Sequence, residues 1–154
     1  MKTIGLRATP TEVWFSVIEE VDHKITISVS SKVNVPVSLI FPEKLNYIRK
    51  TFKDIIWEFK VTGASIRITE SNAQGTSSER ISIEAILQEL LSSSSVEKYF
   101  VGQISNISAK AGFPREDFKK YISGELAFNR VESWSTYNNY QKESILAAIA
   151  AINL

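Results

Sequence analysis

The stretch SIRITESNAQGTSSERISIEAILQELL, residues 65–91, decides the fold of this chain. Its first five residues are rich in β-branched side chains, as in a buried strand. A polar turn follows, and Thr76 and Glu79 have the spacing of a capping box at a helix start. Apolar residues then recur at helical spacing: Ile83, Ile86, Leu87, Leu90 and Leu91. The stretch therefore predicts a strand, a turn and an amphipathic helix, which is half of an α/β unit.

Composition limits the class of protein. The 154 residues suit one domain with its own core, and we expect a single domain over 1–154. No apolar run approaches the roughly 20 residues of a membrane span, and the N-terminus lacks the apolar core of a signal peptide, so we expect a cytoplasmic protein. The absence of cysteine excludes disulfides, thiol catalysis and cysteine zinc sites. A net charge of +1 gives no overall attraction to nucleic acid.

The remaining elements follow from the same patterns. We expect strands over 2–8, 12–20 and 24–30, a helix over 42–60, a strand over 99–104, short helices over 105–111 and 114–122, and a last apolar helix over 140–152. Short turns join the first three strands into an antiparallel meander. Right-handed crossovers then favour a five-stranded mixed sheet of order 3-2-1-4-5 with helices on both faces. That is the layout of the ribonuclease H-like α/β fold.

Three segments resemble ribonuclease H-like nucleases such as the Holliday-junction resolvases. The first strand, IGLRATPTEVWFSVI, resembles the one whose Gly-hydrophobic-Asp motif carries the first metal ligand, and Arg7 stands at that position. The segment IRITE resembles the strand that ends in a catalytic glutamate, which falls on Glu70. The last helix, YQKESILAAIAAI, is similar to the one that supplies the final aspartates. Those places hold Gln141 and Ser144, with Glu143 between them.

The chain also resembles a small bacterial ribonuclease H-like family, domain-of-unknown-function family 3010. That family has a polar glycine-containing loop followed by hydrophobic-x-Glu-Ala-x-x-Gln-Leu, which resembles ISIEAILQEL at 81–90. Its late Tyr-Gln-x-x-Ala motif resembles Tyr140-Gln141, with Ser144 in place of alanine. The resemblance implies the fold and no particular activity.

The resolvase-like positions lack a full set of metal ligands. Two-metal phosphodiester hydrolysis needs several carboxylates that hold ions ~4 Å apart. Glu70 and Glu143 are the only candidates, and Arg7 brings a positive charge to the place of an anionic ligand. We therefore predict a degenerate site of Arg7, Glu70, Gln141 and Ser144 without metal, in which Arg7 and Glu70 form an ion pair. Glu70 is otherwise a solvated strand end.

Two other segments are candidate binding sites. Gly75, Thr76 and Ser77 precede a helix, whose free amides either hold an anion or are simply capped. Trp134 and Tyr137 lie in the segment SWSTYNNY, and they either form a partner interface or anchor a loop over the sheet. The single histidine, His23, is expected in a solvated hairpin turn, and basic residues on two helices are expected on solvated faces: Arg49, Lys50 and Lys53, and Lys110, Arg115, Lys119 and Lys120.

These patterns favour a non-catalytic domain that acts by binding a protein partner, as a subunit, an inhibitor or a toxin-immunity protein does. One alternative is an atypical nuclease that uses Glu70 and Glu143 with Mg²⁺ or Mn²⁺. Another is a nucleic-acid-binding protein that uses the degenerate surface. No cofactor is expected for a binding protein, and the sequence leaves the oligomeric state open.

Overall fold

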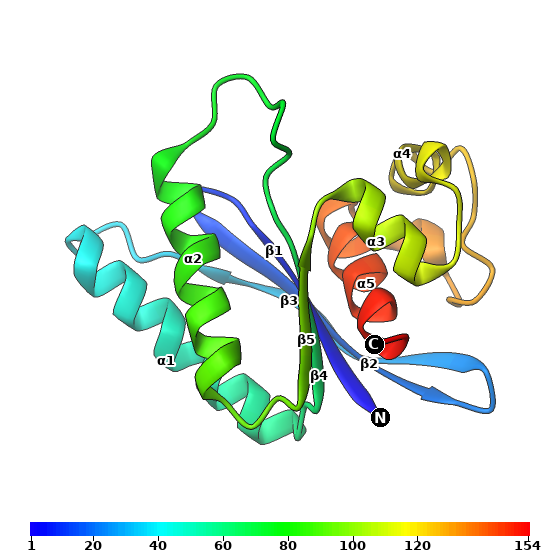
Figure 1. Ribbon diagram of the computed structural model, residues 1–154, viewed down its shortest axis with the longest axis horizontal. Coiled ribbons are helices and arrows are strands. Elements are labelled where there is room, and N and C mark those ends of the chain that lie inside the picture. The colour runs from blue at the N-terminus through cyan, green and yellow to red at the C-terminus, as the bar shows by residue number, and fades with distance from the viewer.

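The computed structural model describes all 154 residues and contains one five-stranded mixed sheet with helices on both faces (Figure 1). The strands are β1 (Lys2–Ala8), β2 (Glu12–Val21), β3 (Lys24–Asn34), β4 (Gly63–Arg67) and β5 (Lys98–Gly102). Their order is β3-β2-β1-β4-β5, in which β1 pairs antiparallel with β2 and parallel with β4. The predicted order and fold are confirmed.

The helices divide between the two faces of the sheet. Helices α1 (Phe41–Phe59) and α2 (Ser78–Ser93) cover one face, and α3 (Ile104–Ala111), α4 (Arg115–Ser123) and α5 (Asn139–Ile152) lie on the other (Figure 1). A short 3-10 turn, η1 (Trp134–Thr136), precedes α5. Each face has its own apolar core, one around Phe52 and Leu87 and the other around Phe118 and Ile149. None of the helices is both long and apolar enough to cross a membrane.

A row of small residues lets α5 pack directly on the centre of the sheet. Ser30, Ser16, Gly5 and Ser65 are paired side by side across β3, β2, β1 and β4. A Cβ added to Gly5 would lie 1.9 Å from the carbonyl oxygen of Ser144, so only glycine permits this approach. The hydroxyls of Ser16 and Ser144 are hydrogen-bonded at 2.6 Å. As predicted from its apolar composition, α5 is buried on almost every side, and residues 145–151 are fully buried.

Several boundaries differ from the predictions: β4 covers Gly63–Arg67 instead of 65–69, β5 covers Lys98–Gly102 instead of 99–104, and two further differences have a clear physical cause. Strand β3 continues to Asn34 rather than ending at Ser30, because its pairing with β2 extends to the start of that strand. Helix α2 is capped by Ser77 and not by Thr76: the Ser77 side chain accepts a hydrogen bond from the amide of Arg80 at 3.3 Å. The sequence around this cap contains a Thr and two Ser in succession, each of which is a good capping residue.

Candidate functional site

A second row of side chains, cationic and aromatic, crosses the sheet two residues away from the row of small residues along each strand. Lys32 of β3 is paired with Trp14 of β2, Trp14 with Arg7 of β1, and Arg7 with Arg67 of β4. Directly paired residues point to the same face of a sheet, so all four lie on the side that α5 covers. We call Lys32, Trp14, Arg7 and Arg67 the cross-strand row. It lies at the carboxyl ends of β1 and β4, where α/β folds usually place ligands.

The outer part of the row forms a stack of aromatic rings and cations. The ring of Trp14 stacks on the ring of Tyr140, the second residue of α5, with centroids 5.5 Å apart and planes 12° from parallel. The ammonium of Lys32 lies 5.2 Å from the Trp14 centroid, and the guanidinium carbon of Arg7 lies 5.9 Å from the Tyr140 centroid. Both distances are typical of cation–π contacts. Tyr140 is 40% exposed, so this stack reaches the surface.

The inner part of the row is an ion network centred on Glu143 of α5. The Nε of Arg7 donates to Oε2 of Glu143, and the Nε of Arg67 lies 3.6 Å from the same oxygen. The predicted ion pair between Arg7 and Glu70 is therefore wrong, and Glu70 instead lies 3.7 Å from Nη2 of Arg67. The reason is geometric. Strand β4 ends at Arg67, so Glu70 lies beyond the sheet, while α5 brings Glu143 onto β1.

The two other acidic residues of this region are already hydrogen-bonded to the backbone. Oε1 of Glu70 accepts the amide of Ile104 at 2.7 Å and so holds the first residue of α3, where the helix dipole favours an anion. Glu84 of α2, which the sequence analysis did not single out, accepts the amide and hydroxyl of Thr69 at 2.9 and 2.8 Å. It also accepts Nε of Arg80 at 2.9 Å. Both carboxylates fasten the chain that leaves β4 to neighbouring helices.

Three arginines lie close together here, and not all of their buried N–H groups have a hydrogen-bond partner. Burial lowers the pKa of Arg67 from its ordinary value, the charge of Glu143 raises it, and the charge of Arg7 lowers it. Burial is also the main reason why the pKa of Arg80 is lowered. Arg67 is 6% exposed. The Nε of Arg67 and the Nη2 of Arg80 are buried without a hydrogen-bond partner. Buried donors normally have partners, so an anionic acceptor would be favourable here.

The residues of this region do not fit the pair of divalent cations that the resemblance to nucleases implies. No three histidine, aspartate or glutamate side chains lie close enough together to hold a metal ion. The guanidiniums of Arg7 and Arg67 stand beside the one carboxylate of α5, and a cation placed there would be repelled. Of the predicted site, the structure brings Arg7 and Glu143 into contact and places Glu70 next to them through Arg67. Gln141 donates to the carbonyl of Ser30, and Ser144 bonds to Ser16, so neither side chain joins the network.

The turn before α2 is an exposed segment that caps its helix. Ser77 is the cap, and the hydroxyl of Thr76 donates to the carbonyl of Ala73 at 3.2 Å. Gly75 has a φ of +67°, a conformation that suits glycine at a turn. Anion binding by Gly75, Thr76 and Ser77 stays a prediction.

Trp134 is a buried anchor and not an interface residue. It is 4% exposed, its indole N–H donates to the carbonyl of Tyr121 at 2.9 Å, and its ring packs against Phe128. The prediction of a partner surface at Trp134 is therefore wrong, because the preceding loop and α4 supply an aromatic cluster that covers the ring. Tyr137 is half-buried and packs against the same core.

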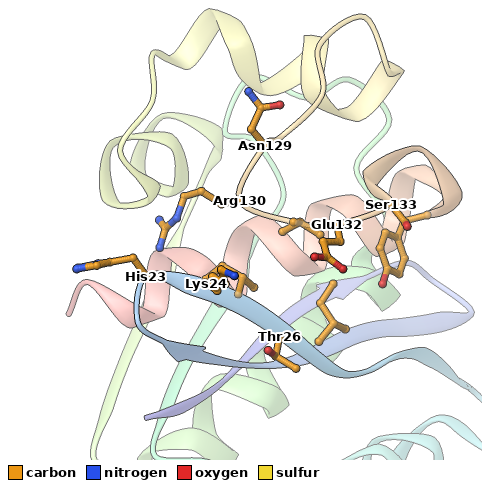
Figure 2. Close-up of a pocket in the computed structure, with 11 residues that line it drawn as sticks. His23, Lys24, Thr26, Asn129, Arg130, Glu132 and Ser133 are labelled. Atoms are coloured by element: carbon orange, nitrogen blue, oxygen red, sulfur yellow. The ribbon is translucent and has the colours of Figure 1, made fainter.

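Tyr137 also lines a groove of about 590 Å³ between the β2–β3 hairpin and residues 129–133 (Figure 2). His23 is exposed in the hairpin turn, as predicted, and Arg130 pairs with Glu20. Trp14 lies near the opposite end of β2, so this groove is separate from the cross-strand row.

The sequence contains a signal for the cross-strand row. Two strands carry the same pattern of a small residue, an apolar residue and an arginine, as Gly5-Leu6-Arg7 and Ser65-Ile66-Arg67. These are neighbouring parallel strands, and the two patterns are paired residue by residue. A charged residue repeated on the helix-covered face of two central strands is costly to bury unless it is paired, so the repeat indicates a cluster of charged groups.

Several solved structures with the same fold are Holliday-junction resolvases. The Thermus thermophilus RuvC structure matches with a TM-score of 0.69 at 10% identity, covering 99% of this chain and 94% of that one. T. thermophilus RuvC in complex with Holliday junction substrate matches with a TM-score of 0.74 at 8% identity, covering 99% and 93%. The yeast mitochondrial Holliday junction resolvase Ydc2 matches with a TM-score of 0.61 at 13% identity, covering 98% and 77%.

No protein-family model matches the sequence, and the comparison with curated proteins gives no match. The structural likeness shows a ribonuclease H-like fold of the resolvase type. The narrower resemblance to domain-of-unknown-function family 3010 stays a prediction.

Proposed function

We propose that this chain is a nucleic-acid-binding domain, with branched DNA as its favoured ligand, and that it binds through the surface around the cross-strand row without divalent-metal cleavage. The observation that carries the proposal is the presence of positive side chains, instead of negative ones, at the carboxyl ends of β1 and β4. The guanidinium of Arg7 stands where resemblance to nucleases leads one to expect a metal-binding carboxylate, and the guanidinium of Arg67 lies beside it on the neighbouring strand. Guanidiniums recognise phosphate directly, whereas carboxylates need a metal ion between them and the phosphate.

The fold supports the choice of ligand class. The T. thermophilus RuvC structure with a TM-score of 0.74 holds a Holliday junction substrate, and a Fowlpox virus resolvase with a TM-score of 0.51 at 13% identity is also a complex with Holliday junction DNA. The present chain covers more than nine-tenths of both. A chain with this fold places the carboxyl ends of its central strands similarly, although the side chains there differ in this protein.

The charge balance predicts modest affinity. Arg7, Arg67 and Arg80 are accompanied by Glu70, Glu84 and Glu143, so the network is close to neutral. Lys32 at the outer end is exposed, and its ammonium pairs with Glu12. We expect about two phosphate contacts and therefore a slope of log affinity against log salt of about −2.

One support for the interpretation as a protein-binding domain is lost, because Trp134, one of the two aromatic residues expected at an interface, is buried. A metal-dependent nuclease is disfavoured by the positive charges beside Glu143. Nucleic-acid binding is favoured by these same positive charges, because they attract phosphate groups.

The test is a binding titration with three labelled DNA ligands of shared sequence: a four-way junction, a duplex and a single strand. Fluorescence anisotropy at low salt is measured once with EDTA and once with Mg²⁺. We expect binding in EDTA, preference for the junction and no cleavage with Mg²⁺. Lys32→Ala should weaken binding severalfold, since it removes one phosphate contact, and the matched variant Lys53→Ala on the opposite face of the sheet should not. Absence of binding to all three ligands, or equal loss in both variants, would overturn the proposal.

A further inference from the structure

We infer that Trp14 and Tyr140 form a stacking platform for an unpaired base and that Lys32 contacts the phosphate of the same nucleotide. This inference rests on the proposed nucleic-acid binding and specifies its ligand as unpaired nucleotides. The platform combines two elements that are distant in sequence, the start of β2 and the first turn of α5.

The geometry is that of a surface for aromatic ligands. The two rings are nearly parallel, at 12° and 5.5 Å, and Tyr140 is 40% exposed although its ring has an aromatic neighbour within the fold. Aromatic residues that only fill a core are covered, as Trp134 is at 4%. The buried indole N–H of Trp14 has no acceptor, so the position does not use the hydrogen bond that usually accompanies a buried tryptophan. Instead, the ring of Trp14 contacts the ring of Tyr140 on α5 and the ammonium of Lys32 on β3.

The two cations beside the rings, Arg7 and Lys32, differ in how firmly the surrounding residues hold them. Arg7 is 9% exposed, and it is held by Glu143 and by the carbonyl of Ala8. Lys32 lies on the edge strand β3, its side chain is 40% exposed, and its ion pair with Glu12 lies at the surface. An arriving base can therefore take the place of the Lys32 ammonium against the indole. The ammonium then turns to the phosphate attached to that base, while Arg7 stays in position.

The ligand has to contain unpaired or splayed nucleotides. In a continuous duplex each base is stacked on both faces by its neighbours, so it offers no ring face to a protein. Single strands and the branch point of a junction provide such bases, and aromatic side chains bind them with little dependence on sequence. Cations at the edge of the platform add the phosphate contact that single-strand sites usually have.

The experiment compares Tyr140→Ala, Tyr140→Leu and Tyr140→Phe with the unchanged protein on a single strand, a four-way junction and a duplex. Tyr140→Ala and Tyr140→Leu remove the ring that packs against the indole of Trp14 and holds it in place. They should therefore weaken binding of the single strand and junction by up to roughly the fivefold to 150-fold of one lost base–aromatic stack, and leave duplex binding unchanged. Tyr140→Phe keeps the ring and should bind like the unchanged protein. Thermal unfolding of each variant shows that the fold is retained, and Tyr140→Leu keeps most of the side-chain volume in case Tyr140→Ala unfolds.

A second measurement does not depend on these variants. A single strand with 2-aminopurine at one position changes its fluorescence when that base stacks on an aromatic ring, and the change should be saturable with the unchanged protein. If no DNA binds at all, the proposed function itself fails. If DNA binds but 2-aminopurine is unaffected, or if the Tyr140 variants change the affinity for duplex and single strand equally, only the platform is overturned.

Discussion

Replacing Glu143 with glutamine tests the ion network, because Glu143 is the carboxylate next to both Arg7 and Arg67. The side chains of Arg7, Glu143 and Arg67 are only 11%, 14% and 7% exposed. Removal of one partner from a buried pair leaves an uncompensated charge and costs about 3–5 kcal/mol. Glutamine keeps one acceptor oxygen, and Glu70 remains near Arg67. We therefore expect a loss near the lower end, about 3 kcal/mol in the free energy of unfolding.

The loss is measured by urea unfolding followed by circular dichroism. The slope of the free energy of unfolding against urea concentration should stay unchanged. For a chain of this size the thermal midpoint should fall by about 6 to 12 °C. Glu89→Gln is the matched control, because Glu89 pairs with Arg49 on the exposed surface of α1 and α2, and we expect no measurable change there.

A double variant, Arg7→Met with Glu143→Leu, distinguishes loss of charge balance from loss of shape. Apolar residues of similar volume often replace a buried ion pair without cost, so the double variant should regain most of the stability that Glu143→Gln loses. The reasoning is refuted if Glu143→Gln is as stable as Glu89→Gln, or if the double variant is less stable than the single one.

Other predictions concern the packing of α5, the cap of α2 and metal ions. Gly5→Ala should lower the free energy of unfolding by about 3 kcal/mol or prevent folding, because the new Cβ would lie 1.9 Å from a backbone oxygen of α5; urea unfolding measures this, and a loss below about 1 kcal/mol would contradict it. Ser77→Ala should cost about 1 kcal/mol and Thr76→Ala only a few tenths, which the same assay resolves, and the reverse order would return the cap to Thr76. Millimolar Mg²⁺ or Mn²⁺ should not raise the thermal midpoint beyond the effect of equal ionic strength, since the guanidiniums repel them; a saturable rise that disappears in Glu143→Gln would show a metal site.

The order of elements and the topology of the sheet were readable from the sequence. Alternation in the first strands, the helical stripe of α2 and the uniformly apolar α5 are local patterns, each contained within about 15 residues. Right-handed crossovers and short connections then leave few possible strand orders, and the predicted one is observed. The burial of α5 on almost every side also follows from its composition alone.

The site could be predicted only in part. Arg7 and Glu143 were both candidates, yet their pairing joins residues 136 positions apart, and no local pattern encodes it. The cross-strand row depends on the register of four strands, and a shift of one residue in any of them would move its side chain to the other face. Glu84 and Arg80 looked like ordinary polar positions of a helix until β4 placed Thr69 beside them.

Trp134 shows that the burial of a side chain is equally hard to predict from the sequence. An exposed interface tryptophan and a buried anchor have the same local surroundings in sequence, and here Phe128 and the carbonyl of Tyr121 decide that the ring is covered. The sequence by itself therefore determined which segments are strands and helices and how the sheet is ordered, since those follow from local periodicity and chain connectivity. Only the tertiary structure decided which charges meet and which rings remain exposed, because burial and ion pairing arise from contacts between segments that are far apart in the chain.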